Sequence, residues 1–291
     1  MRADFNSDWT FTDSKGAKKN IFVPHDAMIG EERNTSNPSS SNGAFFAGGN
    51  YTYEREFYVP DEWKSKIVDF EFEGVYQKAE VYINDKLAGK CIYGYLPFWI
   101  ETKGLLHYGS TNKITVEVYN NEQPNCRWYS GSGIYRPVWM WVQEQVRILH
   151  NGVRITTLSH SPAEIHITKK HDGGQISIEI LDSESNRVLR AKDDDVKLKI
   201  PNAKLWNAEH PYLYTCRDNC ENEGKIIETR DIKFGLRHIS WSTKGFFVNG
   251  ETMPGDIYHN WELCKKYPNS VGDFMWTAWD YIGETGAGVW A

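Results

Sequence analysis

The sequence has few of the features that mark secreted, membrane-spanning or nucleic-acid-binding proteins. Its 291 residues include only five cysteines, and these are scattered rather than grouped with a zinc-type spacing. No apolar stretch approaches the roughly 18 residues of a membrane span, and residues 1–20 lack a basic segment followed by an apolar one. The net charge is −6, and no block rich in Lys and Arg occurs. We therefore expect a cytoplasmic protein without a metal or cofactor, and with neither nucleic acid nor membrane as a partner.

A helical period is also missing before residue 250. The chain instead alternates apolar and polar residues with period 2, which is typical of strands with one buried face. The apolar positions of the clearest runs are Val68, Phe70 and Phe72; Ala79, Val81 and Ile83; Ile114, Val116 and Val118; Ile165 and Ile167; Ile176, Ile178 and Ile180; and Val196, Leu198 and Ile200. Short clusters of Gly, Pro, Asn and Ser between the runs predict antiparallel sandwiches. One longer polar stretch, Asn34–Asn50, is predicted to be a surface loop.

The pattern restarts near Gly152 and then changes again after residue 250. The block of about 95 residues that begins there has the size and rhythm of an immunoglobulin-like sandwich. Beyond it, Asp256–Lys266 is predicted to be a short helix, and Val271–Tyr281 is a nearly continuous apolar run. Such a run favours a strand buried on both faces, as in a parallel barrel.

Five segments of the first half are distinctive when taken together. They are Phe5–Trp9 (FNSDW), Val23–Ala27 (VPHDA), Phe70–Val75 (FEFEGV), Ala79–Asn84 (AEVYIN) and Trp128–Val138 (WYSGSGIYRPV). In this order they resemble the sugar-binding jelly roll of glycoside hydrolase family 2. Three later segments, Ile200–Trp206, His210–Tyr214 and Phe234–Arg237, resemble the immunoglobulin-like domain that follows it in that family.

The resemblance implies a mainly β fold in three parts. A jelly-roll β-sandwich is expected over residues 1–147 and an immunoglobulin-like β-sandwich over residues 148–242. Residues 243–291 resemble a short α/β remnant of the catalytic (β/α)8 TIM barrel, from the end of strand seven to strand eight. In the family, about 250 residues of barrel follow the second sandwich. Here Phe246–Glu251 leads directly into the remnant, so most of the barrel is missing.

The same resemblance assigns only one of the two catalytic carboxyl groups. Glu251 matches the position of the family's nucleophile, although Gly250 stands where the family usually has Ser. The family's acid/base lies in an Asn-Glu dipeptide that ends barrel strand four. This sequence has Asn-Glu only at Asn121-Glu122 and Asn222-Glu223, both within the predicted sandwiches. A retaining glycosidase needs both carboxyl groups, so no acid/base is assigned and we expect the chain to be inactive.

Candidate sugar contacts come from two places in the sequence. Asn125, Arg127 and Trp128 precede the Gly131/Gly133 pair, on a loop that approaches the active-site mouth in such enzymes. The alternative for these three residues is ordinary loop packing. Trp276 matches a tryptophan at the end of barrel strand eight that lines the sugar subsite, and its alternative is simple burial.

The resemblance therefore implies a retaining β-galactosidase acting on terminal β-galactosides, inactive in this form. The alternative is a non-catalytic β-sandwich module that binds carbohydrate or docks onto a partner, and a non-functional remnant is a third. The expected ligand is a carbohydrate, namely a β-galactoside. The apolar segment 271–291 is expected to cause self-association or to pack against the second sandwich.

Overall fold

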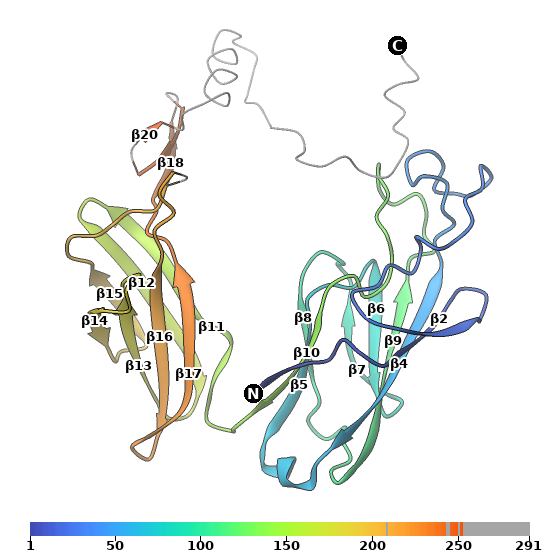
Figure 1. The fold of residues 1–291 in the computed structure, drawn as a ribbon, viewed down its shortest axis with the longest axis horizontal. Helices are drawn as coiled ribbons and strands as arrows, with labels where there is room; N and C mark the ends of the chain where they lie inside the picture. The colour runs from blue at the N-terminus through green and yellow to red at the C-terminus, as the bar shows by residue number, and fades with distance from the viewer. Residues whose placement is uncertain (208, 243–244, 250, 253–291) are drawn as a thin grey trace. The chain divides into compact units, whose positions relative to one another are not determined.

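The computed structural model describes residues 1–207, 209–242, 245–249 and 251–252. Over these residues the regular secondary structure consists almost entirely of antiparallel strands, which loops connect, as Figure 1 illustrates. They form two compact units, of which the first comprises Met1–Glu144 and the second starts at Gln145. The prediction of a mainly β protein made of sandwiches is confirmed. No helix among the described residues is long and apolar enough to cross a membrane.

The first unit contains two antiparallel sheets. The four-stranded sheet has the order β1 (Arg2–Asp4), β10 (Val138–Gln143), β5 (Ile67–Phe72) and β8 (Phe98–Glu101). The six-stranded sheet has the order β3 (Lys18–Ile21), β2 (Trp9–Thr12), β4 (Asn50–Val59), β9 (Ser110–Tyr119), β6 (Lys78–Ile83) and β7 (Lys86–Cys91). A 3-10 helix, η1 (Asp61–Ser65), links β4 to β5. Because β1 pairs with β10, the two ends of the unit's chain are joined in one sheet.

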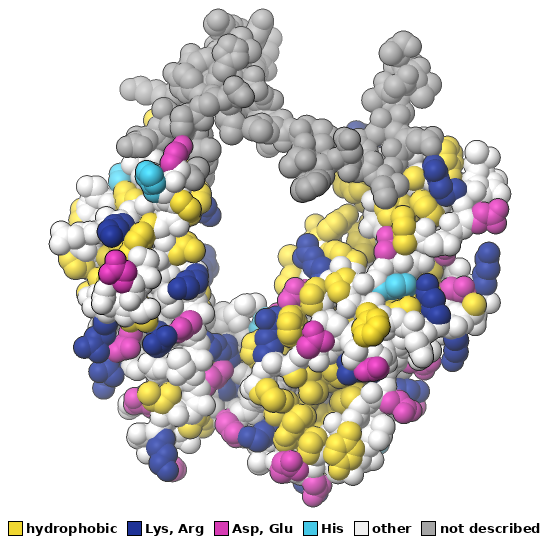
Figure 2. Space-filling view, in the orientation of Figure 1, with side chains coloured by type: hydrophobic (Ala, Val, Ile, Leu, Met, Phe, Trp, Pro, Cys, Tyr) yellow, Lys and Arg dark blue, Asp and Glu magenta, His cyan; other side chains and the backbone are white. Residues whose placement is uncertain are grey.

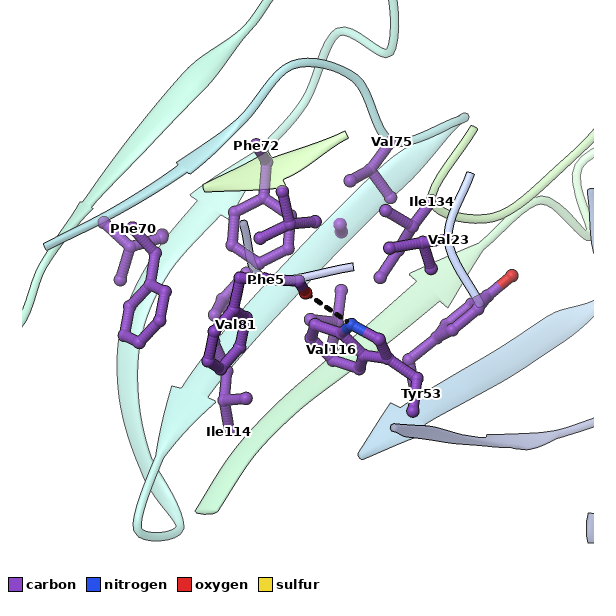
Figure 3. Packing of buried hydrophobic residues seen from close by; sticks show 14 of the residues in the cluster. Phe5, Val23, Tyr53, Phe70, Phe72, Val75, Val81, Ile114, Val116 and Ile134 are labelled. Atoms are coloured by element: carbon purple, nitrogen blue, oxygen red, sulfur yellow. Dashed lines mark hydrogen bonds between the residues drawn. The ribbon is translucent and has the colours of Figure 1, made fainter. Parts of the chain in front are cut away.

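The core of the first unit is rich in aromatic side chains. Phe70 and Phe72 of β5 are fully buried, as the period-2 pattern predicted. They pack with Phe5, Trp9 and further residues of both sheets (Figure 3). The indole N–H of Trp9 donates to the carbonyl of Phe5 at 2.9 Å, so even this polar atom of the core is satisfied. Burial of each such ring contributes about 1.5–3 kcal/mol.

The outer face of β5 differs from the sequence expectation. Asp69 and Glu71 were expected to face solvent, yet they are only 4% and 9% exposed. Trp99 of β8 donates its indole N–H to Asp69 at 3.2 Å, and Trp141 of β10 donates to Glu71 at 2.8 Å. Tryptophans from the two neighbouring strands thus cover the face, which the alternation within β5 alone could not reveal.

The second unit contains two sheets and a small three-stranded ribbon. One sheet has the order β11 (Arg147–His160), β12 (Ala163–Asp172) and β15 (Asp195–Lys199). The other has the order β14 (Arg187–Ala191), β13 (Gln175–Leu181), β16 (Tyr214–Asn222) and β17 (Lys225–Phe234). The ribbon joins β18 (Ile239–Ser242), β19 (Gly245–Val248) and β20 (Glu251–Thr252). The core between the two sheets is mainly aliphatic and contains the predicted inward-facing isoleucines Ile165, Ile167, Ile178 and Ile180.

The loop between β3 and β4 carries a small core of its own. No strand lies in Asn34–Asn50 before its last residue, in agreement with the predicted loop. However, Ala44 and Phe46 are buried against Met28 and are contacted by Tyr129. The predicted helix Asp256–Lys266 and the predicted barrel-type strand Val271–Tyr281 lie outside the described residues.

Candidate functional site

A group of aromatic side chains, three of them exposed and Tyr76 buried beneath them, lies where three loops of the first unit meet. Tyr76 follows β5, Tyr93 and Tyr95 lie between β7 and β8, and Trp128 lies between β9 and β10. The rings of Tyr76 and Tyr95 meet edge to face at 5.3 Å, and those of Tyr93 and Tyr95 are 5.7 Å apart. The side chain of Trp128 lies near the hydroxyl of Tyr95 and acts to lower its pKa. We call Tyr76, Tyr93, Tyr95 and Trp128 the aromatic site.

The aromatic site presents a large apolar surface to solvent. Tyr93 is 57% exposed, Tyr95 41% and Trp128 38%, although rings of this size are usually buried. Two neighbours on the same loop, Ile92 and Leu96, are exposed as well. Such a concentration of exposed apolar side chains marks a contact surface. Flat rings with a polar edge suit the apolar face of a sugar ring.

The phenol groups of Tyr76 and Tyr95 carry no charge at neutral pH. Burial raises the pKa of Tyr76, and its hydrogen bond with Cys126 raises the pKa further. The Tyr76 hydroxyl lies 3.3 Å from the sulfur of Cys126. Burial likewise raises the pKa of Tyr95, with Cys126 as the next cause. The site therefore offers rings and neutral hydroxyl groups, which is the chemistry that a neutral sugar requires.

A buried asparagine fixes the loop that carries Trp128. Asn120 is 1% exposed and donates its side-chain amide to the carbonyl of Gly131 and to the hydroxyl of Ser132. Its side-chain oxygen accepts hydrogen bonds from Gln123 at 3.2 Å and from Asn125 at 2.6 Å. The two ends of the loop are thereby held together by one side chain.

The glycine pair Gly131 and Gly133 closes the loop. Gly131 and Gly133 both have positive φ angles, +68° and +101°, which favour glycine. A Cβ at Gly133 would lie only 2.0 Å from the hydroxyl oxygen of Tyr53. Asp26 fixes the same turn, because its carboxylate accepts a hydrogen bond from the backbone N–H of Ser132 at 3.1 Å and from the hydroxyl of Tyr129 at 2.7 Å.

Of the predicted sugar contacts, the structure places one within the aromatic site and two beside it. Trp128 is a member of the site. Asn125 is half-buried next to Tyr76, but its amide N–H groups are used by Asn120. Arg127 is exposed on the same loop. The prediction that these three residues act in sugar contact stays a prediction.

The two predicted barrel residues are not brought to this site by the described part of the chain. The backbone of Glu251 lies in β20, where it pairs with Val248 of β19 in the second unit. The side chain of Glu251 lies outside the described part of the chain, and so does all of Trp276.

The two Asn-Glu dipeptides lie in the sandwiches, as the sequence indicated. Glu122 is exposed just after β9 and forms an ion pair with Lys78 at 2.7 Å. Glu223 lies in the turn between β16 and β17 with a positive φ angle. Both carboxyl groups therefore belong to surface turns of β-sandwiches. Within the described ranges, no group of three or more His, Cys, Asp or Glu residues could hold a metal ion.

Sequence reasoning missed three of the four members of the aromatic site. Tyr76, Tyr93 and Tyr95 lie on loops distant in sequence from Trp128. A usable signal was the segment Tyr93–Pro97, in which two tyrosines and a leucine flank a turn containing Gly and Pro. Aromatic residues in a turn with no strand pattern around them are candidates for a binding surface.

The aromatic site and its supporting network fall within a match to a known domain family. The family described as glycosyl hydrolase 2 galactose-binding domain-like matches residues 9–137. The family described as glycosyl hydrolases family 2 matches residues 148–237, in the second unit. The chain belongs to glycoside hydrolase family 2.

Full-length members of family 2 are considerably longer than this chain. A β-galactosidase of Bacteroides ovatus is 28% identical over 281 residues, which cover 86% of this chain and 33% of the relative. A β-glucuronidase of Bacteroides fragilis is 27% identical and covers 86% of this chain and 40% of its own length. The crystal structure of a putative β-galactosidase from Bacteroides fragilis superposes with a TM-score of 0.75 at 28% identity, over 87% of this chain and 43% of that one. The chain thus spans about a third to two fifths of the length of these curated relatives.

Proposed function

We propose that this family 2 chain is of the β-galactosidase type, that it contacts terminal β-galactosides through the aromatic site, and that it does not hydrolyse them on its own. The exposed side chains of the aromatic site carry the proposal, because they combine apolar rings with the neutral hydroxyl group of Tyr95. The match of residues 9–137 to a galactose-binding domain-like family supports the choice of sugar. The relatives named β-galactosidase support it as well.

The proposed binding is weak and depends on stacking. The C–H face of a galactose ring would lie against Trp128 or Tyr95, while its hydroxyl groups would exchange hydrogen bonds with Tyr93 or Arg127. The site is an open surface rather than an enclosed cavity. A monosaccharide with about 0.3 kcal/mol per heavy atom would bind with roughly 4 kcal/mol, which corresponds to a Kd of about 1 mM.

Hydrolysis requires chemistry that the two sandwiches do not support. Retaining cleavage requires a nucleophile and an acid/base about 5–5.5 Å apart. Glu251 is the position match for the nucleophile, whereas Glu122 and Glu223 lie in surface turns of different units. The proposal therefore separates sugar contact, carried by the first unit, from bond cleavage.

The test compares binding and turnover on the full chain. Isothermal titration with methyl β-D-galactoside should give millimolar binding that weakens at least threefold in Trp128→Ala and in Tyr95→Ala. Tyr58→Ala is the matched control, since Tyr58 is a 60% exposed tyrosine on β4 of the same unit. Nitrophenyl β-galactoside should remain uncleaved. Binding that is equal in all variants would contradict the sugar-contact proposal, and turnover lost in Glu251→Gln would contradict the proposed inactivity.

Docking onto a protein partner is the second candidate for the same surface. Ile92 is 83% exposed and Leu96 is 59% exposed, and a sugar gains little from such aliphatic side chains. If the galactoside fails to bind while Leu96→Ala abolishes association with a full-length family 2 subunit, the docking function replaces the first one.

The proposal also includes two predictions made from the sequence alone. They are the domain limits 1–147, 148–242 and 243–291, and the cytoplasmic location. Free thiols at the four described cysteines support a reducing compartment. Self-association through residues 271–291 stays a prediction.

A further inference from the structure

The second unit contains a pocket that is independent of the aromatic site. It has a volume of about 590 Å³ and lies between β11, the end of β17 and the start of β18. β11 and β17 are edge strands of the two sheets and lie next to each other (Figure 1). The lining residues place the pocket along this seam of the sandwich. Its main lining residues are Arg154, Thr156, Trp206, Lys233, Phe234 and Arg237. This volume suits a mono- or disaccharide-sized ligand.

The charge of the lining is of one sign. Arg154, Lys233 and Arg237 line the pocket, and no Asp or Glu is among the lining residues that the structure describes. None of these three cations forms an ion pair with a described residue. The ammonium of Lys233 donates to the hydroxyl of Thr215 at 2.7 Å.

The nearby carboxylate of Asp231 does not neutralise the pocket. Its two oxygens accept hydrogen bonds from the guanidinium of Arg217, both at 2.8 Å. Elsewhere on the visible face, basic and acidic side chains are interspersed (Figure 2), and the chain as a whole has a net charge of −6. The three cations therefore form an unusual local excess of positive charge, which attracts an anion.

The Trp206 ring, which forms the aromatic wall of the pocket, is held in place by contacts with the neighbouring backbone. A Cβ on Gly235 would lie 2.9 Å from the Trp206 side chain, so the backbone at the end of β17 packs directly against the indole. The Trp206 backbone donates to the carbonyl of Leu236 at 2.8 Å, and its carbonyl accepts a hydrogen bond from Asn249 at 2.9 Å. The Arg237 guanidinium lies 5.0 Å from the centroid of the Trp206 ring. The cation thus lies over the ring.

We propose that this pocket binds a carbohydrate that carries a carboxylate, such as a hexuronate. The sugar ring would pack against the part of the Trp206 side chain that Gly235 and Arg237 leave open, and its carboxylate would accept charge-assisted hydrogen bonds from Arg237 and Arg154. The hydroxyl of Thr156 and the unpaired backbone N–H and C=O groups of edge strand β11 would form hydrogen bonds with the hydroxyl groups of the sugar ring. A simple inorganic anion would form ion pairs with the cations but would make no contact with the Trp206 ring. The proposal does not depend on the function of the first unit.

A matched pair of ligands tests the charge requirement. Methyl β-D-glucuronide and methyl β-D-glucoside differ only in having a carboxylate or a hydroxymethyl group at C6. Isothermal titration of the full chain should show binding of the glucuronide and at least about tenfold weaker binding of the glucoside. Raising the salt concentration from 50 to about 500 mM should weaken glucuronide binding severalfold, because the Debye length shortens. Equal binding of both sugars, or no binding of either, would overturn the proposal.

Variants locate the site and separate a sugar from a bare anion. Arg237→Gln and Arg154→Gln should each weaken glucuronide binding about three- to tenfold. Arg190→Gln is the control, because Arg190 is an exposed arginine on β14, at the far edge of its sheet, and should leave binding unchanged. Trp206→Phe should weaken the glucuronide while keeping the fold, as checked by circular dichroism. If acetate binds as tightly as the glucuronide, or if Trp128→Ala weakens the glucuronide as strongly as Arg237→Gln does, the proposal is wrong.

Discussion

The hydrophobic cores of the two units are built from different kinds of side chain. The five largest fully buried side chains of the first unit are aromatic and include Trp9, Phe70 and Phe72. In the second unit the equivalent positions are isoleucines such as Ile165 and Ile178. The first unit also presents aromatic rings at its surface, whereas the second unit presents a cationic pocket. The comparison shows that two β-sandwiches with the same period-2 pattern can present opposite surface chemistry.

The buried polar groups differ between the units in the same way. In the first unit they are neutral or hydrogen-bonded groups that fix loops, as Asn120 does behind the aromatic site. In the second unit a lysine and an aspartate are buried in the sheets. Lys169 donates to the carbonyls of Ile176 and Lys192 at 2.7 and 3.1 Å. One oxygen of Asp218 has no hydrogen-bond partner among the described residues. The buried carboxylates of the first unit, Asp69 and Glu71, thus accept hydrogen bonds from tryptophans, whereas the buried carboxylate of the second unit is incompletely hydrogen-bonded.

Gly133→Ala should cause the largest loss of stability and should affect the first unit alone. The new Cβ would clash with the hydroxyl of buried Tyr53 and would also be forced into a positive φ angle. Overpacking and backbone strain together cost about 4 kcal/mol. Calorimetry combined with hydrogen exchange should show earlier opening of the first unit and unchanged peptides in the second.

Gly104→Ala is the matched control for this substitution. Gly104 has a φ of +76° in the same unit, but no atom lies within 4 Å of a Cβ built there. It should cost only the backbone strain of about 1 kcal/mol. Equal losses in the two variants would show that the contact with Tyr53 is unimportant.

The strands of both units could be predicted because burial on one face leaves a period-2 trace. The run at Ile176, Ile178 and Ile180 is β13, and that at Ile114, Val116 and Val118 is β9. The outer face of β5 could not be predicted, because the tryptophans that cover Asp69 and Glu71 come from β8 and β10. The alternation within one strand predicts which of its own side chains face the core. It does not predict which side chains of neighbouring strands cover its other face.

The candidate site was predictable only in part, for a related reason. Trp128 belongs to a segment with a distinctive sequence, so it could be singled out. Tyr76 and Tyr95 join it only because turns after β5 and β7 bring them together. The cationic pocket was not anticipated at all, since Arg154 and Arg237 are 83 positions apart in a chain of negative net charge. Residues that are distant in sequence meet at these sites only because the fold brings their loops and sheet edges together.

Asn120→Ala should cause the next largest effect and connects stability to the aromatic site. The substitution leaves the carbonyl of Gly131, the hydroxyl of Ser132 and the amide of Asn125 without their shared partner. Unsatisfied buried groups of this kind cost about 3 kcal/mol together. Hydrogen exchange should increase in peptides spanning residues 120–135, and galactoside binding should weaken with it.

Asn20→Ala provides the comparison for that variant, because Asn20 is exposed on β3 of the same unit. It should change the free energy of unfolding by less than about 0.5 kcal/mol. If Asn120→Ala loosened the loop but left galactoside binding intact, the aromatic site would not need the order that Asn120 provides.

Asp218→Asn should have the smallest effect of the three and should appear only in the second unit. Burial raises the pKa of Asp218 to about 6, against an ordinary value of 3.8. The folded state therefore binds this proton more tightly than the unfolded state does. The resulting stabilisation is complete below about pH 4 and is lost as the pH rises through 6. Above pH 7 the buried charge costs about 2–3 kcal/mol.

Asparagine resembles the protonated acid in shape and has no charge to bury. The variant should thus be more stable than the parent chain above pH 7, and the fall in stability between pH 4 and 6 should flatten. Asp193→Asn, at an exposed carboxylate of the same unit, should leave the pH profile unchanged. Denaturant unfolding at a series of pH values measures both. Attraction between Asp218 and the buried Lys169 opposes the effect, so an Asn variant that is less stable at pH 8 would mean that the two form a stabilising ion pair. In that case the second unit would use its buried charges for order, as the first unit uses its amides.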